Sequence, residues 1–146
     1  MPVQPPLKIS FHFQTPSLLT GRRRLKEFIA ELFRAESKKL SELTYVFCSD
    51  EYLLAINKSF LQHDYFTDII TFDLSETKES ITGEVYISVD RVRDNAQTLG
   101  VAFNTELLRV IFHGALHLCG YKDKRPQDKK AMTAAEDKYL RLYKTG

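Results

Sequence analysis

The chain has 146 residues, of which 43% are hydrophobic and 27% are charged. This composition is typical of one globular domain and excludes a collagen-like, low-complexity or disordered chain. No stretch approaches the roughly 20 consecutive apolar residues that a membrane-spanning helix needs, and no charged leader precedes an apolar block at the start, so we expect a cytoplasmic protein that forms one domain over residues 1–146.

Charge is distributed unevenly along the chain. Residues 1–40 hold eight Lys/Arg against three Asp/Glu, residues 41–90 hold two against ten, and residues 122–146 hold eight against four. Basic ends around an acidic middle suggest a positive face that could meet phosphates, although solvated outer faces of helices produce the same pattern. The pI of about 8.5 lies below the values typical of nucleic-acid-binding domains, so charge alone favours the second explanation.

Periodicity and capping residues divide the chain into strands and helices. Alternating or β-branched stretches predict strands, and apolar residues three and four apart predict helices. In chain order we expect a strand over 7–13, a helix over 20–36, a strand over 43–48, a helix capped by Ser49 or Asp50 and carrying Leu53 to Phe60, strands over 67–73 and 81–88, a helix over 89–99 ended by Gly100, a helix capped by Asn104 or Thr105 that runs to Cys119 and stops at Gly120, and a helix from Pro126 to about residue 143. The fold class is therefore α+β, a mixed four-stranded sheet packed with about five helices. The two cysteines, Cys48 and Cys119, match no disulfide framework and are expected to be free thiols.

The segment from His113 to Asp123 is H-G-A-L-H-L-C-G-Y-K-D. Residues four apart share one face of a helix, so His113 and His117 can direct both imidazoles at one point. Gly120 allows a left-handed turn, which can return Asp123 beside the second imidazole. Two imidazoles and one carboxylate form a tripod that leaves a fourth tetrahedral position for water, as metal-assisted hydrolysis requires.

Histidine pairs at this spacing are often incidental, but this helix is apolar nearly all round. Two separate core histidines would need two partners, whereas one metal ion satisfies both, so we expect a metal site at the end of a buried helix. The spacing also matches the metzincin proteases, except that their general base, a Glu, is Gly114 here. Two histidines and a carboxylate occur in non-haem iron oxygenases as well, although a ligand tripod on one helix argues against that class.

Further blocks of the chain follow a recognisable order. The first block is H-G-x-L-H-L-x-G-Y, which starts at His113. Ile56-Asn57 with Phe60 matches the pattern L-N-x-x-Y-R, and Thr67-Asp68-Ile69-Ile70-Thr71-Phe72 matches T-D-V-L-S-F. Gly83-Glu84-Val85-Tyr86-Ile87-Ser88 matches a glycine and an acid before a strand that ends I-S, and Met132 with Glu136 matches a late Met with a Glu four residues on. From about residue 40 to its end the chain resembles the YbeY family of rRNA-processing endoribonucleases.

Two positions depart from that family. Its third ligand is His, where this chain has Asp123, and its Asp before that ligand is Lys122 here. A shift of one residue would make Lys124 a ligand, which an ammonium cannot be at neutral pH, so Asp123 is the expected ligand. Leu61 stands where the family has Arg, and the cation that replaces it could be Lys58, one of Arg22–Arg24, Lys122 or Lys124.

The resemblance implies one zinc ion per chain and a single-strand-specific endoribonuclease that acts in 16S rRNA 3′-end maturation and ribosome quality control. Its partner would be small-subunit rRNA, and either water or the RNA 2′-hydroxyl could be the nucleophile. The expected RNA contacts are Lys122, Lys124, Arg125, Thr67 and Asp68. Two alternatives stay open, a ribosome-associated RNA-binding module with a structural or weakly active metal site and, third, a metalloprotease-like hydrolase.

Overall fold

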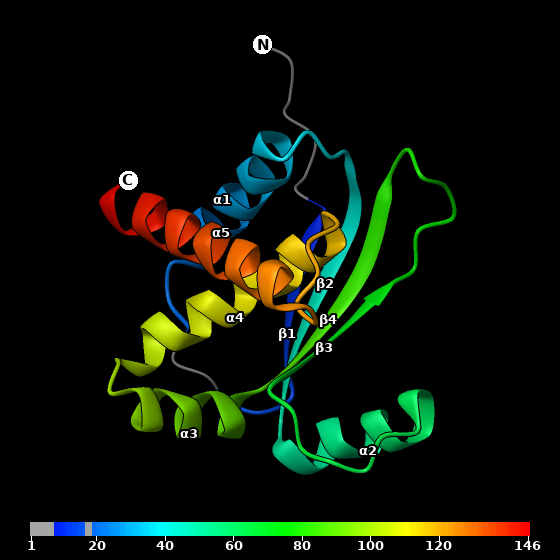
Figure 1. The fold of residues 1–146 in the computed structure, drawn as a ribbon, viewed down its shortest axis with the longest axis vertical. Coiled ribbons are helices and arrows are strands. Elements are labelled where there is room, and N and C mark those ends of the chain that lie inside the picture. The colour runs from blue at the N-terminus through cyan, green and yellow to red at the C-terminus, as the bar shows by residue number, and fades with distance from the viewer. Residues whose placement is uncertain (1–7, 17–18) are drawn as a thin grey trace.

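The computed structural model describes residues 8–16 and 19–146, so Leu7, the first residue of the expected strand, lies outside the described residues. Within the described residues one mixed sheet and five helices form a single α+β domain, which confirms the predicted fold class (Figure 1). The elements are β1 (Ile9–Phe13), α1 (Arg22–Ala35), β2 (Leu40–Cys48), α2 (Asp50–Leu61), β3 (Ile69–Asp73), β4 (Ile81–Ser88), α3 (Val89–Leu99), α4 (Phe103–Leu118) and α5 (Pro126–Thr145).

The sheet has the strand order β1-β2-β4-β3. β1, β2 and β4 run parallel, with Phe11 opposite Tyr45 and Tyr45 opposite Val85, whereas β3 is antiparallel to β4, with Thr71 opposite Val85. β3 therefore forms the antiparallel edge of an otherwise parallel sheet, a common arrangement in α+β domains.

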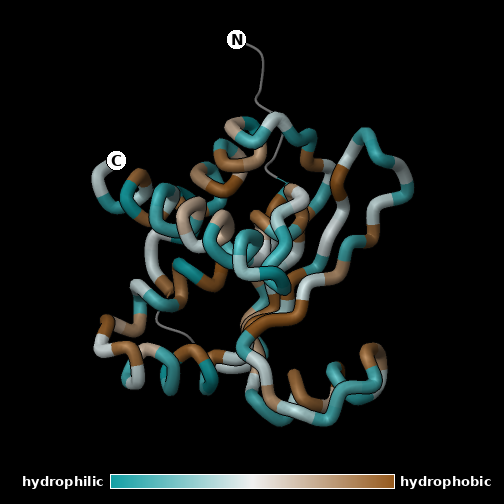
Figure 2. Tube along the Cα trace, in the orientation of Figure 1, coloured by the Kyte–Doolittle hydropathy of each residue, from teal (hydrophilic) through white to brown (hydrophobic). Residues whose placement is uncertain are grey.

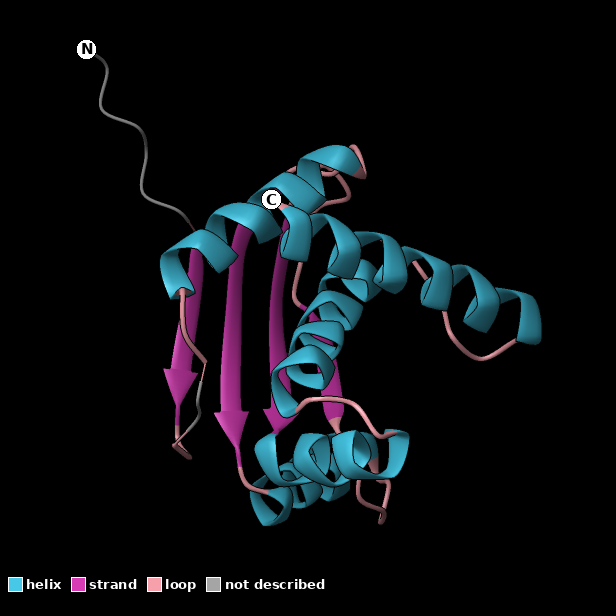
Figure 3. Cartoon of the chain, turned by 90° about the vertical axis from the view of Figure 1, so that its left-hand side faces the viewer, coloured by secondary structure: helices cyan, strands magenta, loops and turns pink. Residues whose placement is uncertain are grey.

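The helices α1, α4 and α5 lie on one side of the sheet and enclose the main core (Figures 1 and 3). On the other side α2 covers a smaller cluster formed by Cys48, Leu53, Ile56 and Ile70. Hydrophobic and hydrophilic residues recur together along α5 in Figure 2, as expected for a helix with one buried face. The described residues contain no helix both long and apolar enough to cross a membrane.

α4 is the central helix, and ten of its sixteen residues are buried, the largest share of any helix in the domain. Tyr45 on β2 donates a buried hydrogen bond of 2.8 Å to the carbonyl of Ile111. Gly114 allows close approach to the sheet, because a Cβ there would lie 2.8 Å from Cγ1 of Val85 and 3.1 Å from Cδ1 of Ile69. These contacts set the height of α4 above β3 and β4.

Some predicted boundaries and caps were wrong. α4 begins at Phe103 with Ala102 as its N-cap and no capping side chain, so neither Asn104 nor Thr105 caps it. Phe103 packs against the main core, and this burial outweighs the preference for a polar cap. β2 starts at Leu40 and β3 at Ile69. The expected caps Ser49 and Gly100 are confirmed, and so is the place of Pro126 in the first turn of α5, after the N-cap Arg125.

The arginines at the start of α1 have structural partners. The guanidinium of Arg22 lies 4.0 Å from the ring centroid of Phe13, and that of Arg24 lies 4.1 Å from the ring centroid of Tyr143. Arg24 also donates to the carbonyl of Tyr143, while Arg23 pairs with Glu27 along the helix at 3.6 Å. Cation–π contacts of this kind help to offset the unfavourable dipole at a helix N-terminus.

Candidate metal centre

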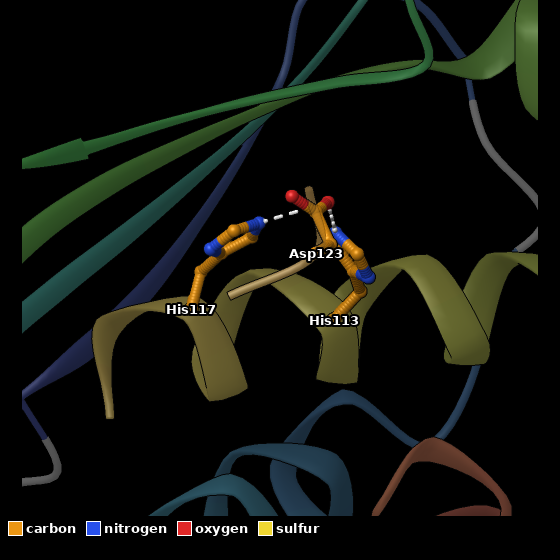
Figure 4. Close-up of side chains that lie close together, drawn as sticks. All are labelled: His113, His117 and Asp123. Carbon is orange, nitrogen blue, oxygen red and sulfur yellow. Dashed lines mark hydrogen bonds and ion pairs between the residues drawn. The ribbon is translucent and has the colours of Figure 1, made fainter. Parts of the chain in front are cut away.

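The three expected ligands come together at the C-terminal end of α4. His113 and His117 lie one turn apart, with ring centroids separated by 4.8 Å and ring planes at 78°. After α4, Gly120 has a φ of 108°, a conformation open mainly to glycine, and the following loop carries Asp123 back over the imidazoles. Oδ2 of Asp123 lies 3.3 Å from Nε2 of His113 and 3.2 Å from Nε2 of His117 (Figure 4).

The geometry fits a zinc-sized ion. Tetrahedral zinc binds nitrogen and oxygen at about 2.0–2.2 Å, which places neighbouring ligand atoms about 3.3 Å apart. Oδ2 of Asp123 lies at 3.3 and 3.2 Å from the two imidazole nitrogens, which agrees with that value, and the three ligand atoms all lie within 4.8 Å of one another. Among the described residues this is the one group of three or more His, Cys, Asp or Glu side chains close enough to share a metal ion. The side chains are 19%, 30% and 38% exposed for His113, His117 and Asp123, so the site opens to solvent.

Behind His113 lies Glu136 from α5. Oε2 of Glu136 is 2.5 Å from Nδ1 of His113, and Oε1 accepts a hydrogen bond of 2.9 Å from Nη1 of Arg109. The Glu136 side chain is only 9% exposed. The sequence matched Glu136 to a family position without assigning it a role, and its distance along the chain from His113 gave no sign of this contact.

The surroundings of the imidazoles are negative. Burial alone would lower the pKa of His113, but its hydrogen bond to Glu136 and the charges of Glu136, Asp123 and Asp68 outweigh burial and raise that pKa above its usual value. Burial raises the pKa of Asp68, and burial together with the charge of Asp68 raises the pKa of Glu106. Such an environment suits a divalent cation.

Two cavities meet at Asp123. The inner one, of about 270 Å³, takes half of its lining residues from carboxylates and also includes His113; its wall contains Asp68, Ile69, Glu106, Arg109, Val110, His113, Asp123 and Glu136. The outer one, of about 460 Å³, is lined by His117, Lys122, Asp123, Lys124, Arg125 and Asp128. The candidate ligands therefore lie between an acidic interior and a rim that carries three cations.

The five residues expected to contact RNA do not all lie in the same cavity. Lys122, Lys124 and Arg125 lie together on the outer rim. Asp68 belongs to the inner wall, where its carboxylate accepts a hydrogen bond from Asn95 at 3.2 Å. Thr67 lines neither cavity, and its hydroxyl donates to the carbonyl of Ile69 at 3.3 Å.

The positions where the chain departs from other patterns also have a structural context. Leu61 ends α2 and is 40% exposed, while Lys58 is paired with Asp64 at 3.3 Å. Position 114, where a metzincin has its general base, faces Val85 and Ile69 on the sheet. A Glu at this position would require α4 to move away from the sheet, which argues against a metzincin-like arrangement on this helix.

The family model and the curated relatives agree on one family. The family model described as Endoribonuclease YbeY matches residues 11–144. Curated proteins named Endoribonuclease YbeY from Cytophaga hutchinsonii and Porphyromonas gingivalis strain W83 are each 48% identical over 134 residues, covering 92% and 91% of this chain and 94% and 88% of their own lengths. The one of the same name from Flavobacterium johnsoniae is 41% identical over 135 residues, covering 92% of this chain and 96% of its own. The solution structure of TM1509 from Thermotoga maritima is similar with a TM-score of 0.63 and 27% identity, covering 92% of this chain and 88% of that one.

Proposed function

The chain belongs to the endoribonuclease YbeY family, and on that basis we propose that it is a metal-dependent endoribonuclease that cleaves single-stranded RNA. The observation that carries this proposal is the convergence of His113, His117 and Asp123 between an inner cavity lined by carboxyl groups and an outer rim that carries three cations. Three protein ligands leave a coordination position for water or a phosphate oxygen, whereas structural zinc sites have four protein ligands. This favours catalysis over a purely structural metal.

We propose zinc as the metal, one ion per chain. Nε2 of His113, Nε2 of His117 and a carboxylate oxygen of Asp123 would hold it, because borderline zinc accepts both nitrogen and oxygen donors. When bound, zinc supplies a Lewis acid for the scissile phosphate and lowers the pKa of a bound water. The carboxylate of Asp123 leaves the occupied site one unit less positive than a third histidine would.

The outer rim is the proposed path of the RNA backbone. Lys124 and Arg125 follow Asp123 in the chain and line the outer cavity with it, and such cations bind phosphates by charge. They supply positive charge beside the ligands in a chain that has Leu61 at the family Arg position. We further propose that the RNA is the 3′ end of 16S rRNA, processed in the cytoplasm during small-subunit maturation and ribosome quality control.

The deciding experiment combines metal analysis with RNA cleavage. Wild type, His113→Ala and His12→Ala are purified, their zinc is measured by mass spectrometry, and each is incubated with a labelled single-stranded RNA and its duplex. His12 is exposed on β1 and serves as the matched control. We expect one zinc per chain and preferential cleavage of the single strand by wild type and His12→Ala, and loss of both properties in His113→Ala.

The outcomes separate the alternatives. Zinc-loaded wild type that binds RNA without cleaving it would indicate the ribosome-associated RNA-binding module. Cleavage by His113→Ala at the wild-type rate would refute the metal site as the catalytic centre. Cleavage of a peptide but of no RNA would return the metalloprotease-like hydrolase to consideration.

The rim is tested through the salt dependence of RNA binding. Each phosphate contact contributes a slope of about −0.7 to log affinity against log salt for single strands. Reversal of Lys124 and Arg125 to Glu should weaken binding and flatten the slope by about 1.4 without loss of zinc. Reversal of Lys129 and Lys130, exposed on α5 outside the outer cavity, is the matched control. Unchanged RNA affinity in the first variant would place the RNA elsewhere.

A further inference from the structure

Glu136 is a buried carboxylate with two different partners. One oxygen, Oε2, contacts Nδ1 of His113 at 2.5 Å, and the other, Oε1, accepts from Arg109 at 2.9 Å. Few polar or charged residues of the described chain are buried to this extent. Burying a carboxylate costs free energy unless its oxygens are paired. The contacts with His113 and Arg109 offset that cost for Glu136.

We propose that Glu136 is the positioning residue for His113. It accepts a hydrogen bond from Nδ1–H and so selects the tautomer in which Nε2 carries the lone pair. Nε2 is the atom that faces Asp123 at 3.3 Å. A neutral imidazole has one protonated and one unprotonated nitrogen, and an outer carboxylate of this kind orients a ligating histidine and raises its basicity. The inference rests on the metal site of the proposed function.

Arg109 holds Glu136 from the opposite side. Nη1 of Arg109 binds Oε1 of Glu136, and Nη2 binds Oδ1 of Asp137 at 2.6 Å. The planar guanidinium thus spans two successive residues of α5, which restricts the rotation of the Glu136 carboxylate. Arg109 and His113 lie one turn apart on α4, so both partners of Glu136 come from the same helix face. Asp137, 54% exposed, shares Arg109 and is not a partner of His113.

The first test follows the tautomer of His113 in the metal-free full-length protein by long-range ¹H–¹⁵N NMR at mildly alkaline pH. Wild type should show protonated Nδ1 and unprotonated Nε2. Glu136→Ala should lose this single form and show a mixture of tautomers. Asp137→Asn, the matched control, removes the charge from the exposed arm of the Arg109 fork and should keep the wild-type signature.

The second test measures zinc affinity by chelator competition. Loss of an outer partner of a ligating histidine weakens metal binding by about 10–100-fold, which is the expected effect of Glu136→Ala. Glu136→Gln keeps an acceptor oxygen without the charge and should lie between Ala and wild type. Asp137→Asn should stay within about twofold of wild type, because the contact with His113 is intact.

Two results would overturn the proposal. One is a folded Glu136→Ala, by circular dichroism, with the wild-type tautomer and wild-type zinc affinity. The other is an equal loss of affinity in Asp137→Asn, which would assign the effect to packing of α5. If Glu136→Ala does not fold, Glu136→Gln decides; because Gln still offers an acceptor to Nδ1–H, the affinity is the readout there, and wild-type zinc affinity refutes the proposal. Neither readout uses RNA, so failure of the nuclease function is distinguishable from failure of this inference.

Discussion

Replacing Gly114 by Ala probes the closest approach between α4 and the sheet. In an ordinary helix this change stabilises by about 1 kcal/mol, because glycine is a poor helix former. Here the new Cβ would lie 2.8 Å from Cγ1 and 3.2 Å from Cγ2 of Val85, and 3.1 Å from Cδ1 of Ile69. Comfortable carbon–carbon contacts lie at about 3.5–4.0 Å, so the methyl group has no room without movement.

The size of the effect follows from which neighbour can move. Val85 is 0% exposed on β4, and a β-branched side chain has few alternative rotamers, so α4 itself must shift. Overpacking of this kind costs about 1–3 kcal/mol, and a contact as short as 2.8 Å to a stiff neighbour belongs in the upper part of that range. After subtraction of the helix propensity, Gly114→Ala should destabilise by about 1–2 kcal/mol, or roughly 3–6 °C in Tm for a chain of this length.

The assay is urea unfolding of the chelator-treated protein, which keeps zinc binding out of the measurement. A double-mutant cycle with Val85→Ala gives the sharper test, because it removes two of the three short contacts. In that background Gly114→Ala should stabilise by up to about 1 kcal/mol. If Gly114→Ala stabilises the wild-type background, or has the same effect in both, the steric argument is refuted.

The remaining predictions concern the metal ligand, protons and thiols. Asp123→Ala should weaken zinc binding by more than about 100-fold, beyond the loss of an outer partner, while Asp123→His should retain it; equal affinities in chelator competition would remove Asp123 from the site. The pKa values of His113 and Asp68 are raised in the metal-free folded protein, so the folded state binds more protons than the unfolded state. The stability that these two groups contribute is therefore present below their unfolded pKa values and is lost as pH rises through their folded pKa values. The Tm of the chelated protein should therefore fall from about pH 5 to about pH 8, less steeply in His113→Asn, and a wild-type slope in that variant would contradict this. Burial raises the pKa of the Cys48 and Cys119 thiols to about 12 from 9.0, so iodoacetamide should label the native protein about a thousandfold more slowly than the urea-unfolded chain, and equal rates would show that the thiols are accessible.

The tripod of candidate ligands could be predicted because each link in it is local. His113 and His117 are four residues apart on one helix, and Asp123 returns through a turn that Gly120 permits at a φ of 108°. Helix geometry and glycine conformation apply wherever the segment lies in the molecule. The predicted N-cap of the same helix was wrong for the opposite reason, because burial of Phe103 depends on the rest of the core.

The contact between Glu136 and His113 could not be predicted from local sequence patterns. Glu136 lies 23 residues from His113 along the chain, and nothing in the spacing of α5 reveals that its carboxylate meets an imidazole of α4. Likewise, the sequence identified Lys122, Lys124 and Arg125 as cations near a candidate ligand, but their common cavity with His117 depends on how the loop lies against α4.

Periodicity and short-range turns thus account for the elements, the mixed α+β class and the two imidazoles with their carboxylate, because backbone geometry acts over a few residues. Packing decided the rest: the approach of α4 to Val85, the contact between Glu136 and His113, and the division of charge into an acidic interior and a basic rim. Those features depend on how separate elements fill one core, and close packing couples each of them to every neighbour at once.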